Sequence, residues 1–192
     1  MTQRSILVSG VPGVGKSSCL ERVADACKDM VVDGVISAEI RRDGKRCGFG
    51  MRLISSGSCG ILASPDIDST IRFGTLNPDS GEPRLGVTHD FLKNTVCSHL
   101  RGIIGEADLI VVDEIGSMQA TCDEFIDVVN ELIAAGTPLL ASISLADDPW
   151  IQALRSRGDI PVLELTKSNR DLTTEMLTSY VREWVNIAHS LR

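Results

Sequence analysis

Three glycines, a lysine and three serines stand close together near the start of the chain, in the stretch LVSGVPGVGKSS at residues 7–18. Their spacing satisfies the pattern G-x-x-x-x-G-K-[ST], in which a glycine-rich turn between a strand and a helix cradles phosphate groups. Glycines let backbone N–H groups turn inward without a Cβ in the way, and the N-terminus of a helix favours an anion. We therefore expect a nucleotide-phosphate site made of Gly10, Val11, Pro12, Gly13, Val14, Gly15, Lys16, Ser17 and Ser18.

Two side chains in this loop are predicted to act on the phosphates directly. The Lys16 ammonium adds a point charge near the β- and γ-phosphates and takes part in catalysis, and the Ser17 hydroxyl is placed to bind Mg²⁺. The expected substrates are nucleoside triphosphates, and the expected cofactor is Mg²⁺.

A pair of carboxylates follows an apolar run in the stretch DLIVVDEIGS at residues 108–117. Phosphoryl chemistry on a phosphate loop needs a carboxylate at the end of a neighbouring strand to hold the metal's ligand shell, and Asp113 is the candidate. Glu114 is the candidate general base that orients a water for attack on the γ-phosphorus. Gly116 completes a D-x-x-G spacing, from which a backbone N–H can reach the γ-phosphate.

The stretch LELTKSNRDL at residues 163–172 leaves an apolar strand and enters a helix, and we expect it beside the nucleobase. Asn169 offers both a donor and an acceptor, and the Arg170 guanidinium can stack on any base, so the pair predicts broad base tolerance. The alternative is that Asn169 caps the final helix while Arg170 is exposed. Strict guanine selection is disfavoured, because Asn169 stands where N-K-x-D would place its aspartate.

The elements that must position these residues alternate between strands and helices. Apolar runs with β-branched residues occur at 6–8, 109–112, 139–143 and 162–165, mostly separated by stretches with helical periodicity. This pattern predicts an α/β P-loop fold of three layers, with a mostly parallel sheet and helices on both faces. We expect a β-hairpin at about 34–63, inserted after the first helix and turning at Asp43-Gly44, and a long loop or small excursion at the sheet edge at 64–86.

Length and composition narrow the remaining possibilities. A chain of 192 residues with 43% hydrophobic residues predicts a single domain over 1–192. The net charge of -7 opposes binding to nucleic acid or to an anionic membrane surface, and no run of about 18 apolar residues occurs. Six cysteines without a C-x-x-C pair favour reduced thiols, so we expect a cytoplasmic protein. We separately expect a monomer or a weak homo-oligomer.

Four segments together resemble one family: GVPGVGKSS, GVISAEIRRDGKRCGF, VVDEIGSM and LTKSNRD. They are similar to the cancer-related nucleoside triphosphatase and its thermophile relatives, which are small P-loop NTPases. In the hairpin region the matching residues are Glu39, Arg41, Arg46, Gly48 and Phe49, whereas Val35, Ile36 and Ala38 depart from the family pattern. The resemblance implies slow Mg²⁺-dependent hydrolysis of nucleoside triphosphates with modest choice among bases. It also favours contact of Arg41 and Arg46 with the triphosphate, against the alternative that both are solvated turn charges.

Two other functions remain open from the residues alone. A small-molecule or nucleotide kinase uses the same loop and the same Mg²⁺ carboxylate for transfer to a hydroxyl. A nucleotide-dependent switch or binding module would use hydrolysis only to reset its conformation.

Overall fold

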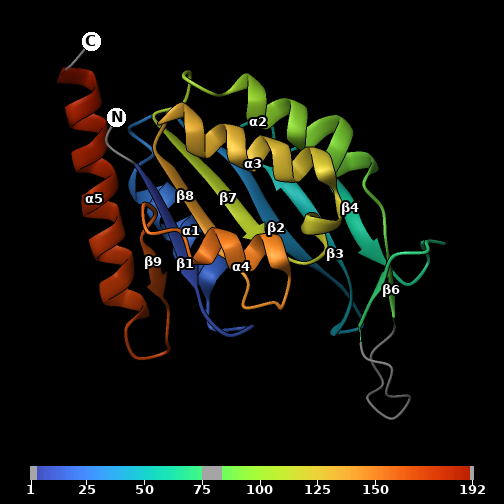
Figure 1. The fold of residues 1–192 in the computed structure, drawn as a ribbon. Helices are drawn as coiled ribbons and strands as arrows, with labels where there is room; N and C mark the ends of the chain where they lie inside the picture. Colours follow the sequence, from blue (N-terminus) through green and yellow to red (C-terminus); the bar gives the residue numbers. More distant parts are fainter. Residues whose placement is uncertain (1–3, 75–83, 191–192) are drawn as a thin grey trace.

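The computed structural model describes residues 4–74 and 84–190. Within that part, nine strands form one sheet in the order β5-β6-β4-β3-β2-β7-β8-β1-β9 (Figure 1). The strands are β1 (Ser5–Ser9), β2 (Val32–Arg42), β3 (Lys45–Leu53), β4 (Cys59–Ser64), β5 (Arg72–Phe73), β6 (Leu85–Val87), β7 (Leu109–Ile115), β8 (Leu139–Ile143) and β9 (Val162–Glu164). The main helices are α1 (Lys16–Ala26), α2 (Ser98–Gly102), α3 (Asp123–Ala135), α4 (Pro149–Arg155) and α5 (Arg170–Ser190).

The parallel half of the sheet comprises β9, β1, β8, β7 and β2. Both β1 and β8 are buried along their whole length, as strands covered on both faces must be. Helices α1 and α5 pack on one face around Leu20 and Leu177, while α2, α3 and α4 pack on the other around Phe125 (Figure 1). The predicted α/β P-loop architecture, with helices on both faces of the sheet, is therefore confirmed.

The antiparallel half is larger than the hairpin expected at 34–63. The turn forms as predicted, because Asp43 and Gly44 both adopt positive φ between the paired residues Arg42 and Lys45. A third strand, β4, then pairs with β3, and β6 and β5 extend the sheet further. The segment expected as a loop or edge excursion at 64–86 thus supplies the edge strands, although 75–83 lie outside the described residues.

Strand β2 belongs to both halves. Its residues Val32 to Val35 pair in parallel with β7, and the remainder, from Val35 to Arg42, pairs antiparallel with β3. Gly34 lies so close to β7 that a Cβ there would come within 1.9 Å of the Val111 carbonyl oxygen, which explains the glycine. The inserted region is therefore a continuation of the central sheet.

Between β6 and β7, a π-helical segment, η2 (Leu92–Cys97), runs directly into α2. A short 3-10 turn, η3 (Gln119–Thr121), precedes α3. Among the described residues, no helix combines the length and apolar character needed to cross a membrane.

Candidate nucleotide site

The phosphate loop joins the end of β1 to the start of α1. Gly10, Gly13 and Gly15 all have positive φ, a conformation that side chains with a Cβ rarely adopt. At Gly10 a Cβ would also come within 2.7 Å of the Leu165 carbonyl oxygen, which belongs to the segment after β9. The loop thus needs these glycines, and it lies against the segment expected to meet the nucleobase.

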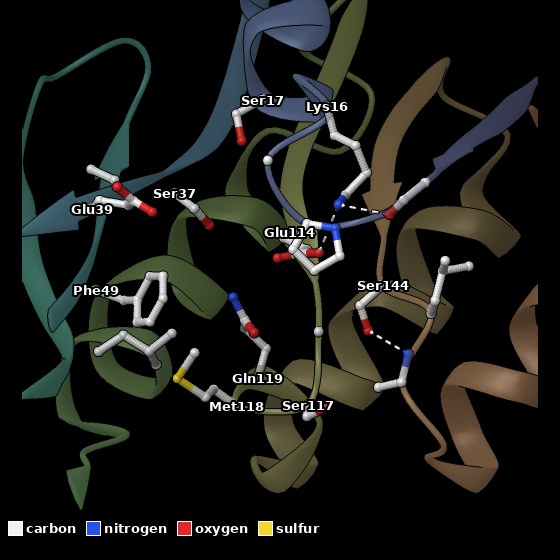
Figure 2. A pocket seen from close by; sticks show the side chains of 18 of the residues that line it. Lys16, Ser17, Ser37, Glu39, Phe49, Glu114, Ser117, Met118, Gln119 and Ser144 are labelled. Carbon is white, nitrogen blue, oxygen red and sulfur yellow. Dashed lines mark hydrogen bonds and ion pairs between the residues drawn. The ribbon is translucent and has the colours of Figure 1, made fainter. Parts of the chain in front are cut away.

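Lys16 is the first residue of α1, and its side chain turns back across the loop. Its Nζ donates to the Gly10 carbonyl oxygen at 3.2 Å and lies 3.5 Å from Glu114 Oε1 (Figure 2). The lysine side chain is 10% exposed, so its charge acts in a poorly solvated environment. The phosphate loop and the acidic end of β7 therefore meet through this one cation.

Asp113 lies on β7 and is 1% exposed. The Ser142 hydroxyl donates to Asp113 Oδ1 at 2.5 Å, and the Ser37 backbone N–H donates to Oδ2 at 3.3 Å. The Ser37 hydroxyl also donates to the backbone carbonyl of Asp113. Burial raises the pKa of Asp113 above its ordinary value, although hydrogen bonds from Ser142, Ser17 and Ser37 and the charge of Lys16 act to lower it.

The position of Asp113 in the sheet corrects one expectation. The metal-binding carboxylate was expected on a strand neighbouring the phosphate-loop strand, but β8 lies between β1 and β7. Ser142 stands on this intervening strand and holds the carboxylate from there. The sequence alone shows only that both strands are apolar, and their spatial order is set by the crossover connections.

Glu114 follows Asp113 and is half-buried, facing the loop. Burial raises its pKa, the nearby Asp113 charge raises it further, and Lys16 lowers it, with a net upward shift. Gly116 follows shortly after, and a Cβ there would come within 3.1 Å of Gln119 Oε1. The end of β7 thus presents a carboxylate with raised proton affinity beside a lysine.

A cleft of about 870 Å³ opens over these groups. Of the residues expected to act, the following line it: Gly10, Pro12, Gly13, Gly15, Lys16, Ser17, Ser18, Arg46, Glu114 and Gly116. Val14 is instead part of the core, Val11 is 57% exposed, and Asp113 lies buried at the strand end.

The two hairpin arginines differ in position. Arg46 lines the cleft, where its guanidinium lies 5.2 Å from the centroid of the Phe49 ring and 3.6 Å from Glu39. Arg41 is not among the lining residues; it pairs with Glu39 at 2.5 Å and donates to the Gly44 carbonyl oxygen at 3.1 Å. The structure therefore brings Arg46 to the phosphate loop's cleft and leaves Arg41 at the hairpin turn.

Asn169 and Arg170 lie at the start of α5 and do not line the cleft. The Asn169 side chain accepts a hydrogen bond from the Thr166 backbone N–H at 2.7 Å and donates to the Glu164 carbonyl oxygen at 2.9 Å. Its backbone carbonyl accepts the first helical bond, from Thr173 N–H. The asparagine side chain thus closes the preceding loop, while Arg170 is exposed.

Comparison with known proteins places this geometry in a family. Residues 5–178 match the family model described as NTPase. The chain belongs to this NTPase family. The family predicted from four short segments is thereby confirmed.

Two relatives of this NTPase are similar over most of their length. Nucleoside-triphosphatase THEP1 of Thermococcus kodakarensis is 35% identical over 168 residues, which span 86% of this chain and 88% of that protein. The protein of the same name from Thermotoga petrophila is 32% identical over 166 residues, which span 86% of each.

Two solved structures are similar to this NTPase over nearly the whole chain. The solution structure of a human cancer-related nucleoside triphosphatase has a TM-score of 0.68 and 25% identity, covering 98% of this chain and 99% of that one. The crystal structure of THEP1 from Aquifex aeolicus has a TM-score of 0.76 at 24% identity, covering 92% and 98%, and shows the shared fold.

The donor atoms of this NTPase fit a magnesium ion. Mg²⁺ prefers hard oxygen ligands and binds through one or two carboxylates together with substrate phosphates. Asp113 supplies a carboxylate, and Ser17 supplies a hydroxyl that lies near enough to lower the pKa of that carboxylate, so the two oxygen donors lie together at the foot of the loop. These are the residues that would hold the metal.

Several residues in or beside the cleft were given no role from the sequence. Ser37 and Ser142 hold Asp113, and Phe49, Met118 and Gln119 form the wall beyond Glu114. The signal for Ser142 was present as a hydroxyl inside the apolar strand LLASI. Phe49 was marked only by its match to the family pattern, and Met118 and Gln119 carry no signal, because the convergence of these side chains depends on how β3 and η3 lie in space.

Proposed function

We propose that this chain hydrolyses nucleoside triphosphates to the diphosphate and phosphate, with Mg²⁺ as cofactor and broad tolerance of the base. The observation that carries the proposal is the meeting of Lys16 and Glu114 at 3.5 Å inside the cleft over the phosphate loop. Family membership and the name nucleoside-triphosphatase given to the relatives support the same activity. The single continuous sheet supports a catalytic unit that spans 1–192 as one domain.

In the proposed mechanism, backbone N–H groups of the phosphate loop and the Lys16 ammonium bind the triphosphate. The N–H dipoles and the ammonium charge are in place before the reaction begins, so they stabilise the charge that develops on the γ-phosphate without reorganisation. Arg46 is the hairpin arginine that we propose for contact with the phosphates, since it lines the cleft, whereas Arg41 is held at the turn. Bound Mg²⁺ neutralises charge on the phosphate oxygens.

Glu114 is the proposed general base. It faces the cleft beside Lys16, and its raised pKa increases the affinity of the carboxylate for the proton of an attacking water. Asp113 is buried and hydrogen-bonded by two serines, so it is suited to holding a metal rather than to exchanging protons with solvent.

Broad base tolerance follows in this proposal from what surrounds Asn169. Its side-chain amide is already bonded to the backbone of Glu164 and Thr166, so it is poorly placed to read the pattern of a base edge. The exposed Arg170 can still stack on any base as a planar cation.

Phosphate release from each common nucleoside triphosphate, with Mg²⁺ and with the metal chelated, tests the proposal. We expect Lys16→Ala to abolish turnover while leaving the fold intact, because the lysine compensates phosphate charge and is not a core residue. Lys28→Ala, at an exposed lysine just after the same helix, is the matched control and should retain full activity. Undiminished phosphate release by Lys16→Ala, or release that needs no metal, would contradict the proposal.

A further inference from the structure

The cleft continues past Glu114 into an apolar chamber. We use the name acceptor chamber for the part lined by Phe49, Leu62, Phe73, Met118 and Gln119, with Glu39 and Arg46 at its side. Figure 2 shows the Phe49 ring and the Met118 thioether on one side, Lys16 and Glu114 on the other, and the Gln119 side chain between them. Gln119 is only 4% exposed, so a buried amide is aimed at the space between the two groups.

The chamber lies on one defined side of the reacting groups. Its walls come from β3, β4, β5 and η3, beyond β7 in the sheet order, whereas the segment proposed for the nucleobase follows β9 at the opposite edge. Lys16 and Glu114 lie between the chamber and the segment proposed for the nucleobase. In phosphoryl transfer the attacking oxygen approaches in line with the leaving group, so the attacking molecule sits on the far side of the γ-phosphate from the nucleotide. That far side is the acceptor chamber.

The chemistry of the chamber exceeds what hydrolysis needs. The whole cleft, which also includes the space over the phosphate loop for the triphosphate, has about 870 Å³, a volume typical of sites that bind small organic ligands. Two phenylalanines, a leucine and a methionine offer apolar contact, and the Gln119 amide offers both donors and an acceptor. Such walls suit a planar ring with polar edges, stacked on an aromatic side chain.

We propose that the acceptor chamber binds a second small molecule of the nucleoside class, which carries a planar heterocycle and a free hydroxyl, and that the γ-phosphoryl group is transferred to that hydroxyl. This inference rests on the proposed function, since the donor is the nucleoside triphosphate held by the phosphate loop. The Phe49 ring stacks on the heterocycle, Gln119 binds its polar edge, and Glu39 accepts from a hydroxyl. When no acceptor is bound in the chamber, a water molecule attacks the γ-phosphorus instead, and the triphosphate is hydrolysed.

The transfer step balances without a further reactant. The acceptor's hydroxyl oxygen forms a bond to the γ-phosphorus, and the bond from the γ-phosphorus to the bridging oxygen breaks. The nucleoside diphosphate leaves with that electron pair. The hydroxyl proton passes to the Glu114 carboxylate and from there to solvent.

The experiment incubates the full chain with Mg²⁺, ATP labelled in the γ-phosphate, and adenosine, guanosine, cytidine, uridine or thymidine in turn. The measured quantity is the partition ratio, the label recovered in a phosphorylated nucleoside divided by the label recovered as inorganic phosphate. We expect a ratio above the no-acceptor background with at least one nucleoside. Release of inorganic phosphate with no transfer to any of the five overturns the inference and leaves the proposed function standing, whether or not the nucleosides inhibit that release. No turnover of ATP under any condition overturns both.

A pair of phenylalanine variants tests the chamber itself. Phe49→Ala removes the proposed stacking surface and should lower the partition ratio by about tenfold. Phe91→Ala removes a partly buried ring of the core that does not line the cleft, and its partition ratio should match that of the unmodified chain. Gln119→Glu replaces the amide with a carboxylate of the same size, and its partition ratio should also be reduced. This variant tests the chamber if Phe49→Ala fails to fold. Equal ratios in all of these proteins would overturn the placement of the acceptor.

Discussion

Ser142 provides the sharpest test of how the metal-binding carboxylate is held. Its hydroxyl donates to Asp113 Oδ1 at 2.5 Å, and both residues are inaccessible, with exposures of 0% and 1%. A hydrogen bond to a charged group contributes about 1.5–3 kcal/mol. For a chain of this size, each kcal/mol shifts the melting temperature by about 2–4 °C. We therefore expect Ser142→Ala to lower the melting temperature by about 3–12 °C.

The same substitution should weaken the response to metal. Loss of a side chain that orients a metal-binding group commonly reduces metal affinity by about 10- to 100-fold. Ser142→Ala should thus raise the Mg²⁺ concentration for half-maximal phosphate release by at least about tenfold, measured by titration at saturating nucleotide. Thermal unfolding of the same samples gives the stability.

Ser9→Ala is the matched control, because Ser9 is also buried on a parallel strand but its hydroxyl reaches only a neutral carbonyl oxygen, at 3.5 Å. It should lose less than about 1 kcal/mol and keep its Mg²⁺ requirement. If Ser142→Ala melts earlier but saturates at the same Mg²⁺ concentration as the unmodified chain, Ser142 only stabilises the sheet, and the reasoning about Asp113 is refuted.

Three further predictions concern the base, the nucleobase and acid stability. Glu114→Gln should retain nucleotide affinity but slow phosphate release by about 100-fold or more; weaker binding at an unchanged rate per bound complex would place the base elsewhere. Arg170→Ala should raise KM several-fold for all nucleoside triphosphates with little change in melting temperature, and unchanged kinetics would exclude stacking. Asp33 is buried, which raises its pKa, but hydrogen bonds, the first from His99 at 3.0 Å, lower it below the ordinary value overall. Its stabilisation is therefore complete above the unfolded-state pKa of about 4 and is lost as the pH falls through the lower folded value. In urea unfolding, Asp33→Asn should be less stable than the unmodified chain at pH 7, with a gap that narrows near pH 3, and a constant gap would refute this account.

The sequence was sufficient for features that depend on local spacing. The phosphate loop, the Asp43-Gly44 turn and the strand at Leu139–Ile143 follow from short-range rules about glycine conformation and apolar runs. These rules act within a few residues, so they do not depend on how distant elements pack. The strands at Ser5–Ser9, Leu109–Ile115 and Val162–Glu164 could be predicted for the same reason, although their order in the sheet could not.

The spatial order of the strands could not be predicted from those local rules. The insertion of β8 between β1 and β7 depends on the crossover connections between parallel strands, which the local pattern does not specify. The role of Asn169 illustrates the same limit. Its sequence context fits a base contact or a helix cap, whereas its side chain bonds to the Thr166 and Glu164 backbone instead.

The eleven-residue strand β2 has a mechanical consequence for ligand choice. Because one unbroken backbone pairs with β7 on one edge and with β3 on the other, the wall that carries Glu39 and Phe49 is bonded to the strand that carries Asp113. The ladder between β2 and β7 ends at Val35, and beyond it Ser37 donates two hydrogen bonds to Asp113, so swinging that wall outward would break the bonds from Ser37. We therefore expect this wall to select ligands by the shape of its side chains on a fixed backbone. A ligand whose shape does not match these side chains is excluded.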